Sequence, residues 1–112
     1  MALVAFPDMI EHLPEIDINL EGVLGRLLQA GDKQIVFFDL EPIGRIPPHS
    51  HGAQWGIVLS GEIEMRIDAS TRVLRKGDSY YIPAGVEHEV RALMPSQAMD
   101  MFDEPARYKV KK

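Results

Sequence analysis

His49 and His51 are separated by one residue in the stretch "PPHSHGAQWGIVLSGE", residues 47–62, just before a run of strand-forming residues. Residues two apart on a strand point to the same side, so both imidazoles can reach one cation. The same spacing also occurs in polar turns, where the histidines are simply solvated. Further ligands are therefore needed before a metal site can be inferred.

Two further residues supply them. His88 begins the segment "HEVRAL", in which His88, Val90 and Ala92 share one face that can enter a core. Gln54 follows His51 by three residues, and its carbonyl oxygen can serve as a neutral ligand. The chain has no cysteine, so thiolate sites are excluded. Three imidazoles and one amide oxygen favour a divalent transition metal, Zn, Ni, Fe, Co, Cu or Mn, over Mg or Ca.

Asp100 is the candidate for proton transfer. It shares a strand face with Ala98 and Phe102 in "QAMDMF", an unusual place for a carboxylate unless an interior group pairs with it. A buried acid beside a cation can act as a general acid or base. Two alternatives remain: a salt bridge from Asp100 to Arg107 at a frayed strand edge, or a register shifted by one, which would turn Asp103 inward instead.

Three residues are candidates for contact with a substrate. Arg26 lies within the apolar segment "VLGRLLQ" and could bind a carboxylate if it points inward, although strand arginines usually point outward. Trp55 and Tyr81 are expected in the core or the wall of the pocket. His12 is distant from these residues and is expected on the surface.

Short strands must position these residues. Alternating or β-branched runs separated by Gly, Pro, Asp and Ser indicate an all-β sandwich or barrel. In "EIEMRID", for example, Ile63, Met65 and Ile67 share one face. Strands are predicted at residues 23–29, 33–41, 55–60, 62–68, 71–76, 79–83, 88–93 and 97–102. The segment "FPDMIEHLP" is either a short helical turn after Pro7 or an arm that packs on a neighbour.

Length and charge limit the remaining possibilities. A chain of 112 residues predicts one domain, which we divide into an N-terminal arm, residues 1–20, and a barrel, residues 21–112. The net charge of −5 and the scattered basic residues argue against nucleic acid as a partner. We find no leader-like start and no apolar run of the ~20 residues that a membrane span needs. We expect a cytoplasmic protein without membrane contact.

Two spaced motifs resemble those of the cupins. The first joins Gly44, His49, His51, Gln54 and Gly61, with Gln54 where most cupins have a carboxylate. The second joins Gly77, Pro83, Gly85 and His88, with Ala92 in place of a final Asn. The resemblance implies a single double-stranded β-helix, or jelly-roll, barrel with one divalent metal held by the three histidines and Gln54. Without the carboxylate, the site would keep the full charge of the ion and favour an anionic ligand.

Among small cupins, the chain resembles the type that converts unsaturated monouronates into linear keto-uronates in pectin and alginate degradation. The segment "DMFDEPAR" resembles the end of that type and implies a catalytic Asp100 and a substrate-binding Arg107, with one extra residue before Pro105. The expected function is ring opening or tautomerisation of a small sugar acid in carbohydrate metabolism. The alternatives are a metal-dependent dioxygenase and a non-catalytic module that binds a sugar or acid. We also expect a homodimer, with the segment "MALVAF" lying across a partner's sheet.

Overall fold

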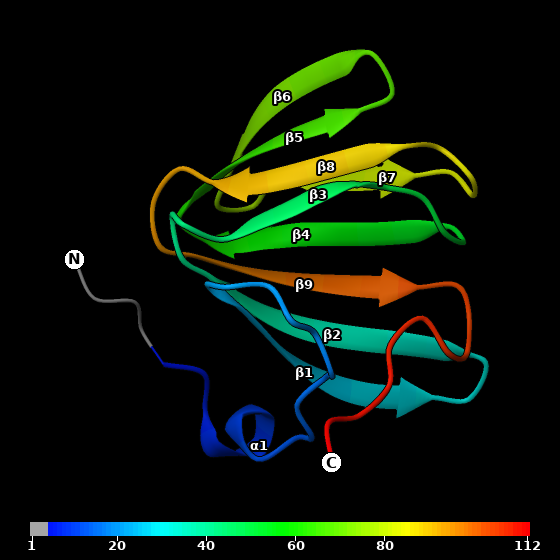
Figure 1. Ribbon diagram of the computed structural model, residues 1–112. Helices are drawn as coiled ribbons and strands as arrows, with labels where there is room; N and C mark the ends of the chain where they lie inside the picture. Colours follow the sequence, from blue (N-terminus) through cyan, green and yellow to red (C-terminus); the bar gives the residue numbers. More distant parts are fainter. Residues whose placement is uncertain (1–4) are drawn as a thin grey trace.

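The computed structural model describes residues 5–112 and consists of two antiparallel sheets that face each other (Figure 1). The five-stranded sheet has the order β1-β2-β9-β4-β7 and the four-stranded sheet the order β3-β8-β5-β6. This is the jelly-roll barrel that the sequence predicts. The strands are β1 (Val23–Ala30), β2 (Lys33–Leu40), β3 (Arg45–His49), β4 (Gln54–Ser60), β5 (Glu62–Ile67), β6 (Ser70–Arg75), β7 (Ser79–Ile82), β8 (His88–Ala92) and β9 (Ser96–Phe102).

Strict alternation along the strands creates the barrel interior. In β2, the even-numbered residues from Gln34 to Leu40 are buried while the odd-numbered residues are only half-buried. Such alternation is what a sheet with one face on the core requires. The inward side chains of both sheets form a single core, which includes Val36, Phe38, Ile63, Met65 and Phe102.

Strand β3 was missed by the sequence analysis. Its residues Pro47 and Pro48 lack the backbone N–H that a central strand must donate, so the stretch does not resemble an ordinary strand. The structure accommodates them because β3 is an edge strand whose pairing with β8 shifts between Ile46 and His49. Every other strand was predicted to within one residue at each end.

The described part of the N-terminal arm packs on the barrel of its own chain. Helix α1 (Asp8–Glu11) is the short helical turn predicted after Pro7. Beyond it, Ile16 is buried in the core and pairs with Val110 in an isolated bridge. Residues 1–4 of "MALVAF", expected on a partner's sheet, lie outside the described residues. The domain boundary at residue 20 stays a prediction.

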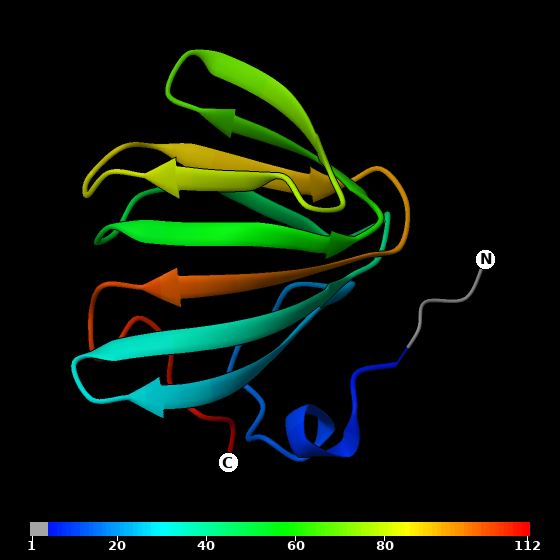
Figure 2. The ribbon, with the colours of Figure 1, turned by 180° about the vertical axis from the view of Figure 1, so that it is seen from behind.

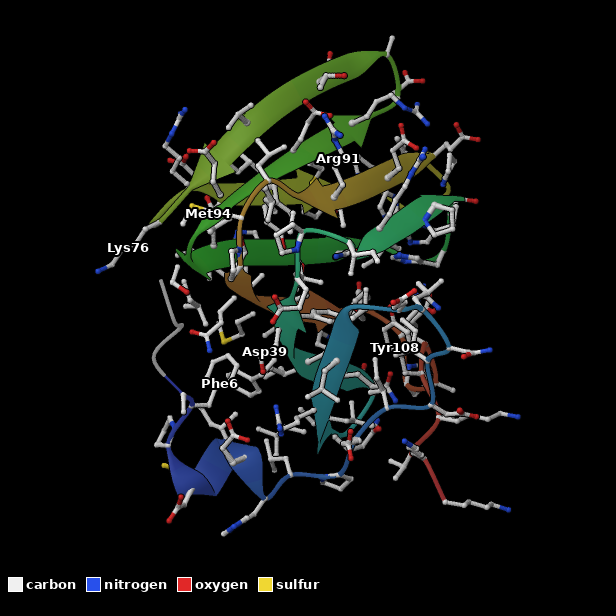
Figure 3. All side chains as sticks on the ribbon, turned by 60° about the vertical axis from the view of Figure 1, so that its left-hand side comes forward. Phe6, Asp39, Lys76, Arg91, Met94 and Tyr108 are labelled. Atoms are coloured by element: carbon white, nitrogen blue, oxygen red, sulfur yellow. The ribbon has the colours of Figure 1, made fainter. Side chains whose placement is uncertain are left out.

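The outer face of the four-stranded sheet is charged. Arg91 on β8 pairs with Glu64 on β5 at 3.0 Å, and Arg66 and Arg45 both pair with Glu89. Figure 3 shows Arg91 among the charged side chains of this sheet. Within residues 5–112, no helix is long and apolar enough to span a bilayer.

Candidate metal centre

Three histidines converge at one end of the barrel interior. His49 ends β3, His88 begins β8, and the two are paired in the sheet register. His51 lies in the loop after β3, and one ring nitrogen from each histidine lies within 4.8 Å of the others. The convergence was predicted from the motif spacing, but the strand geometry considered for His49 and His51 was wrong: His51 is not on the strand, and the chain turns it toward its partners after β3 ends.

Backbone carbonyls fix how each imidazole presents its nitrogens. Nδ1 of His49 lies 2.8 Å from the Pro47 carbonyl oxygen, Nδ1 of His51 lies 2.8 Å from that of Gly52, and Nδ1 of His88 lies 3.0 Å from that of Val86. A carbonyl oxygen can only accept, so each Nδ1 must carry the hydrogen. Each Nε2 of the neutral ring therefore has a free lone pair. Metal-binding histidines are commonly oriented in this way.

Electrostatics keep these rings neutral. Burial lowers the pKa of His51 to about 4, and the positive charge of Arg107 acts in the same direction. Burial also lowers the pKa of His49 and of His88. Neutral imidazoles are the form that binds a metal.

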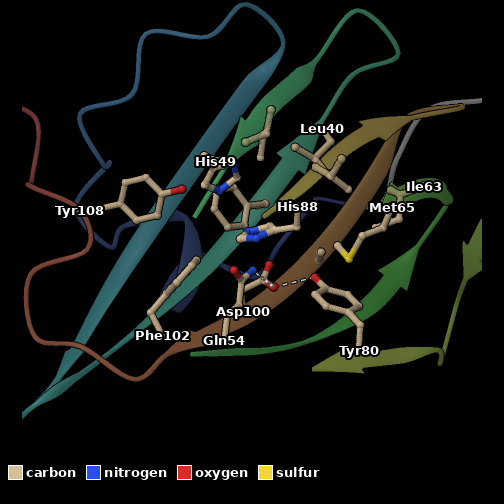
Figure 4. Close-up of a pocket in the computed structure, with 14 residues that line it drawn as sticks. Leu40, His49, Gln54, Ile63, Met65, Tyr80, His88, Asp100, Phe102 and Tyr108 are labelled. Atoms are coloured by element: carbon tan, nitrogen blue, oxygen red, sulfur yellow. Dashed lines mark hydrogen bonds between the residues drawn. The ribbon is translucent and has the colours of Figure 1, made fainter. Parts of the chain in front are cut away.

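Gln54 begins β4 and points into the same cavity, where Figure 4 shows it beside His88 and Asp100. Its side chain is 8 % exposed, and its Nε2 donates to Oδ1 of Asp100 over 2.8 Å. This bond identifies the amide nitrogen, because a carboxylate oxygen can only accept. Oε1 of Gln54 is consequently the free end, and it is buried without a hydrogen-bond partner.

Asp100 on β9 is 3 % exposed and holds the polar cluster together. Besides the Gln54 amide, the Tyr80 hydroxyl donates to Oδ1 of Asp100 over 2.6 Å. Burial raises the pKa of Asp100 to about 6, while the hydrogen bonds from Tyr80 and Gln54 act against that rise. A carboxyl group with such a pKa can take up and release a proton near neutral pH.

The predicted register of β9 is confirmed. Asp100 is inward with Ala98 and Phe102, while Asp103 is exposed and lies 3.2 Å from the amine of Lys33. Asp100 is bound by Gln54 and Tyr80, so the alternative of a salt bridge with Arg107 at a frayed edge is not what the structure shows.

Gly56 makes room for this cluster. It pairs with Tyr80 on one side and Asp100 on the other, and a methyl group in its place would collide with the Asp100 carboxylate and the Tyr80 ring. The absence of a side chain at residue 56 therefore allows three strands to bring a tyrosine, a carboxylate and an amide together.

Tyr80 is the functional candidate that the sequence analysis missed. Tyr81, the tyrosine expected at the site, is 59 % exposed on the outer face of β7, whereas Tyr80 is buried. The alternation of "SYYI" contained the signal, because the buried Ile82 shares the face of Tyr80.

Two other expected contact residues are also outside the cavity. Trp55 is exposed on the outer face of β4. Arg26 points outward, as strand arginines usually do, and its guanidinium pairs with Glu11 at 2.7 Å and with Asp39 at 3.2 Å. The inward orientation that would let it bind a substrate carboxylate is not what the structure shows. The structure thus does not bring Arg26, Trp55 or Tyr81 to the histidines.

Arg107 lies at the mouth of the barrel despite the extra residue before Pro105. Its guanidinium carbon is 4.3 Å from the centre of the Tyr108 ring and 5.9 Å from that of Phe102, and its charge reaches all three histidines. Nε of Arg107 is buried without a partner. Nε of Arg107 is therefore a free hydrogen-bond donor near the histidines, although the same side chain also bonds to Tyr108.

The interior cavity and a surface groove share a wall beside His49. The cavity is mostly apolar, and it is lined by His49, His88, Gln54, Asp100 and Tyr80 together with Phe38, Leu40, Ile46, Ile63, Met65, Val90, Ala98, Phe102 and Tyr108. The groove runs between residues 17–20 and 106–109 and shares Ile46, His49 and Tyr108 with the cavity. His49 thus lies between the interior cavity and the groove that Arg107 lines.

The donor set fits a divalent cation. Nε2 of His51, Nε2 of His88 and Oε1 of Gln54 are all buried lone-pair donors without a hydrogen-bond partner in the described chain. Burying a polar atom without a hydrogen-bond partner costs free energy. A bound cation would satisfy the lone pairs of all three atoms, which explains why they lie buried together. The three histidines are thus placed to bind a metal ion, whose identity the geometry leaves open.

Comparison with known proteins agrees with this site. The cupin domain model Cupin_2 matches residues 36–103. The structure of KdgF from Halomonas sp. is 26 % identical, with a TM-score of 0.74 over 82 % of this chain and 88 % of that one. An RmlC-like cupin from Shewanella frigidimarina is also 26 % identical, with a TM-score of 0.77 over 87 % of both chains.

A more distant likeness shows the fold alone. Oxalate decarboxylase from Bacillus subtilis is 21 % identical, with a TM-score of 0.74 over 87 % of this chain and 29 % of that one. The comparison with curated proteins gave no match. Since the domain model covers more than half of the sequence and includes His49, His51, Gln54 and His88, the chain belongs to the cupin domain family.

Proposed function

We propose that this cupin binds one divalent transition metal through Nε2 of His49, His51 and His88 and Oε1 of Gln54, and isomerises a small anionic sugar acid. The observation that carries the proposal is the set of buried, unpartnered lone pairs beside a carboxyl group whose pKa is about 6. The lone pairs would coordinate the metal ion, and the carboxyl group of Asp100 would transfer the proton.

Charge supports an anionic substrate. All four proposed ligands are neutral, so a divalent ion would keep its full charge in the cavity. Arg107 adds a second positive charge at the mouth, within reach of a ligand that also contacts His49. A carboxylate on the substrate would satisfy the free Nε of Arg107.

Asp100 is the proposed acid and base. Both of its hydrogen bonds end on Oδ1, so Oδ2 is the oxygen through which a proton would pass. Tyr80 and Gln54 hold the carboxyl group in place, and the apolar lining excludes bulk water from the proton in transit. A bound divalent ion would supply Lewis acidity, stabilising negative charge on a substrate oxygen.

Ring opening of a 4,5-unsaturated uronate needs only these functions. The hydroxyl proton of the hemiacetal leaves as the ring C–O bond breaks, which gives an aldehyde and an enol. The enol then loses its O–H proton and gains a proton on carbon, giving a ketone. The reaction is an isomerisation, so no oxidant or water is consumed. The likeness to KdgF and the resemblance of "DMFDEPAR" to the uronate-linearising type support this choice.

The direct test combines metal analysis with a substrate assay. We expect about one divalent metal per chain in purified protein, and loss of the ultraviolet absorbance of unsaturated uronates when the loaded protein is added. Asp100→Asn should keep the metal and lose turnover, because the amide preserves shape but cannot exchange the proton. His12→Ala, which changes an exposed histidine, is the matched control and should retain both.

The outcomes separate the competing functions. Oxygen uptake during turnover would replace the isomerase with a dioxygenase. Saturable binding of uronates without any loss of absorbance would indicate a binding module. Full activity in Asp100→Asn would refute the assigned role of Asp100.

A further inference from the structure

His51 differs from the other proposed metal ligands in how the fold holds it. His49 ends β3, Gln54 begins β4 and His88 begins β8, so each of these ligands has its backbone in a sheet. His51 instead lies in the loop of residues 50–53 between β3 and β4. The hydrogen bonds of a sheet fix the backbone of a strand residue, whereas a loop residue needs other partners. The position of His51 must therefore depend on contacts outside the sheets.

Backbone groups of two neighbouring segments hold both ends of this loop. The Gly85 N–H donates to the His51 carbonyl, and the Asp103 N–H donates to the Ala53 carbonyl, each over 2.9 Å. Asp103 directly follows β9, and Figure 2 shows the end of β9 (orange) beside the start of β4 (green). The segment after β9 thus begins next to the loop that carries His51.

The middle of the loop is held by a side chain. The Gly52 N–H donates to Oε2 of Glu104 over 2.6 Å, which is shorter than the ~2.9 Å of an ordinary N–H···O bond. Hydrogen bonds to a carboxylate are short because the acceptor is charged. A methyl group at residue 52 would collide with the Glu104 carboxylate, so the glycine permits this close approach. Glu104 lies in "DMFDEPAR", in the stretch with the extra residue before Pro105.

Gly52 connects Glu104 to the imidazole of His51. The Gly52 N–H is bonded to Glu104, and the Gly52 carbonyl oxygen accepts from Nδ1 of His51 over 2.8 Å. Nε2 of the same ring is the buried nitrogen without a hydrogen-bond partner. The position of the Gly52 backbone therefore determines where the free lone pair of His51 points.

We propose that Glu104 is a positioning residue of the metal centre, which holds the His51 imidazole in its ligand orientation through the backbone of Gly52. This inference rests on the metal binding proposed above. Glu104 acts by accepting a hydrogen bond, so an uncharged acceptor at residue 104 should serve nearly as well. Holding the loop in advance reduces the conformational entropy that metal binding would otherwise cost.

The first test is calorimetric titration of Zn²⁺ into a matched set of variants. Glu104→Ala removes the acceptor, and we expect affinity to fall roughly 10-fold, the lower end of the ~10–100-fold that loss of an outer-shell partner costs. Glu104→Gln keeps an acceptor oxygen and should retain most of the affinity. Asp103→Ala removes the same charge from the adjacent residue, whose carboxylate lies 3.2 Å from the amine of Lys33. This control should bind Zn²⁺ as the wild-type protein does.

The second test reads the His51 ring in metal-free protein by nuclear magnetic resonance. In the wild-type protein, the Gly52 amide should exchange slowly with solvent, and the ring nitrogens of His51 should show the hydrogen on Nδ1. In Glu104→Ala, the Gly52 amide should exchange faster and the His51 ring should become a mixture of its two neutral forms. The rings of His49 and His88 should not change, because their Nδ1 atoms face the carbonyls of other residues. Circular dichroism should be the same in all four proteins.

The outcomes distinguish failure of this inference from failure of the proposed function. A wild-type protein that binds no metal would refute the metal site, while a single His51 form that depends on Glu104 would still support the orienting role. Unchanged affinity and an unchanged His51 ring in Glu104→Ala would overturn the inference. Equal losses of affinity in Glu104→Ala and Glu104→Gln would also overturn it, because charge would then matter and the hydrogen bond would not. An equal loss in Asp103→Ala would have the same meaning.

Discussion

Two buried glutamines, Gln34 and Gln54, show how the same side chain serves different purposes at two places in the barrel. They lie on β2 and β4, on either side of β9, and both pair with Phe102 in the sheet register. Both point inward, with exposures of 2 % and 8 %. Their hydrogen bonds, however, differ completely.

The amide of Gln34 is fully used. Its Nε2 donates to Oε1 of Gln29 and to the carbonyl of Tyr108, each over 3.0 Å, and its Oε1 accepts from the Tyr108 backbone N–H over 2.9 Å. Gln54 uses only Nε2, on Asp100, and leaves Oε1 unpaired. A saturated amide stabilises the fold, whereas an amide with one free end is available to a ligand.

The largest effect is expected from loss of His88, which lines the same cavity as Gln54. His88→Ala removes one of the orphaned nitrogens, and we expect metal affinity to fall by more than the ~10–100-fold that loss of an outer-shell partner costs. Isothermal titration with a divalent metal would measure the fall. The exposed His12→Ala is the control. Unchanged affinity in His88→Ala would mean that the unpaired atoms of Gln54 and the histidines do not form one site.

Exchange of the two glutamines for alanine tests the comparison directly. Gln34→Ala should lower the free energy of unfolding by about 1–3 kcal/mol, because two backbone groups of Tyr108 lose their partner. Its metal affinity should change little. Gln54→Ala should instead lower metal affinity by roughly 10–100-fold.

Urea unfolding of the metal-free proteins and metal titration would give both numbers. The contrast between the glutamines would fail if both variants lost stability and affinity to the same degree.

A methyl group at residue 56 should disturb the cluster of Gln54, Asp100 and Tyr80 and leave the hydrogen bonds of Gln34 unchanged. Gly56→Ala forces the Asp100 carboxylate and the Tyr80 ring to move, at a cost of about 1–3 kcal/mol in unfolding free energy. Since Asp100 orients the Gln54 amide, metal affinity should fall as well. Gly31→Ala is the control for a loss of stability away from the site, because its φ of +61° strains an alanine although nothing lies within 4 Å of the added methyl. Unaltered affinity in Gly56→Ala would show that the amide orientation does not depend on Asp100.

The smallest effect is a pH dependence of the metal-free protein. The pKa of His51 is about 4 in the folded state against an ordinary 6.5, so the unfolded chain binds more protons between these values and stability falls as pH falls. The lowered pKa values of His49 and His88 add to this loss. Asp100 opposes it, because its pKa is raised from 3.8 to about 6 and the folded state takes up its proton first.

Three histidines outweigh one carboxyl group, so unfolding free energy should decline from pH 6.5 toward pH 4. In Asp100→Asn the decline should be steeper. Urea unfolding at several pH values would measure both slopes, and a steeper slope in the wild-type protein would contradict the assigned pKa directions.

The sequence predicted those parts of the molecule that local alternation determines. Eight strands and the inward faces of His88 and Asp100 follow from side chains that alternate along a strand. The convergence of His49, His51 and His88 followed from motif spacing, although the chain achieves it through a loop. Neither result required knowledge of long-range contacts.

The errors arose where the local conformation depends on contacts with residues distant in sequence. Pro47 and Pro48 are compatible with a strand only at a sheet edge, and no local pattern identifies an edge. The outward direction of Arg26 follows from the alternation along β1, but its ion pairs with Glu11 and Asp39 join residues distant in sequence. The bond between Gln54 and Asp100 joins residues 46 positions apart, so the free end of the amide could be recognised only in three dimensions.

Tyr108 lines the cavity from a segment that belongs to no strand of the barrel. Gln34 forms hydrogen bonds with the backbone carbonyl and N–H of Tyr108, and the pairing of Val110 with Ile16 holds the residues that follow. One wall of the cavity therefore comes from a segment that supplies none of the proposed metal ligands. Sequence changes at residues 106–109 could redirect substrate preference while the histidines and the sheets that carry them stay as they are.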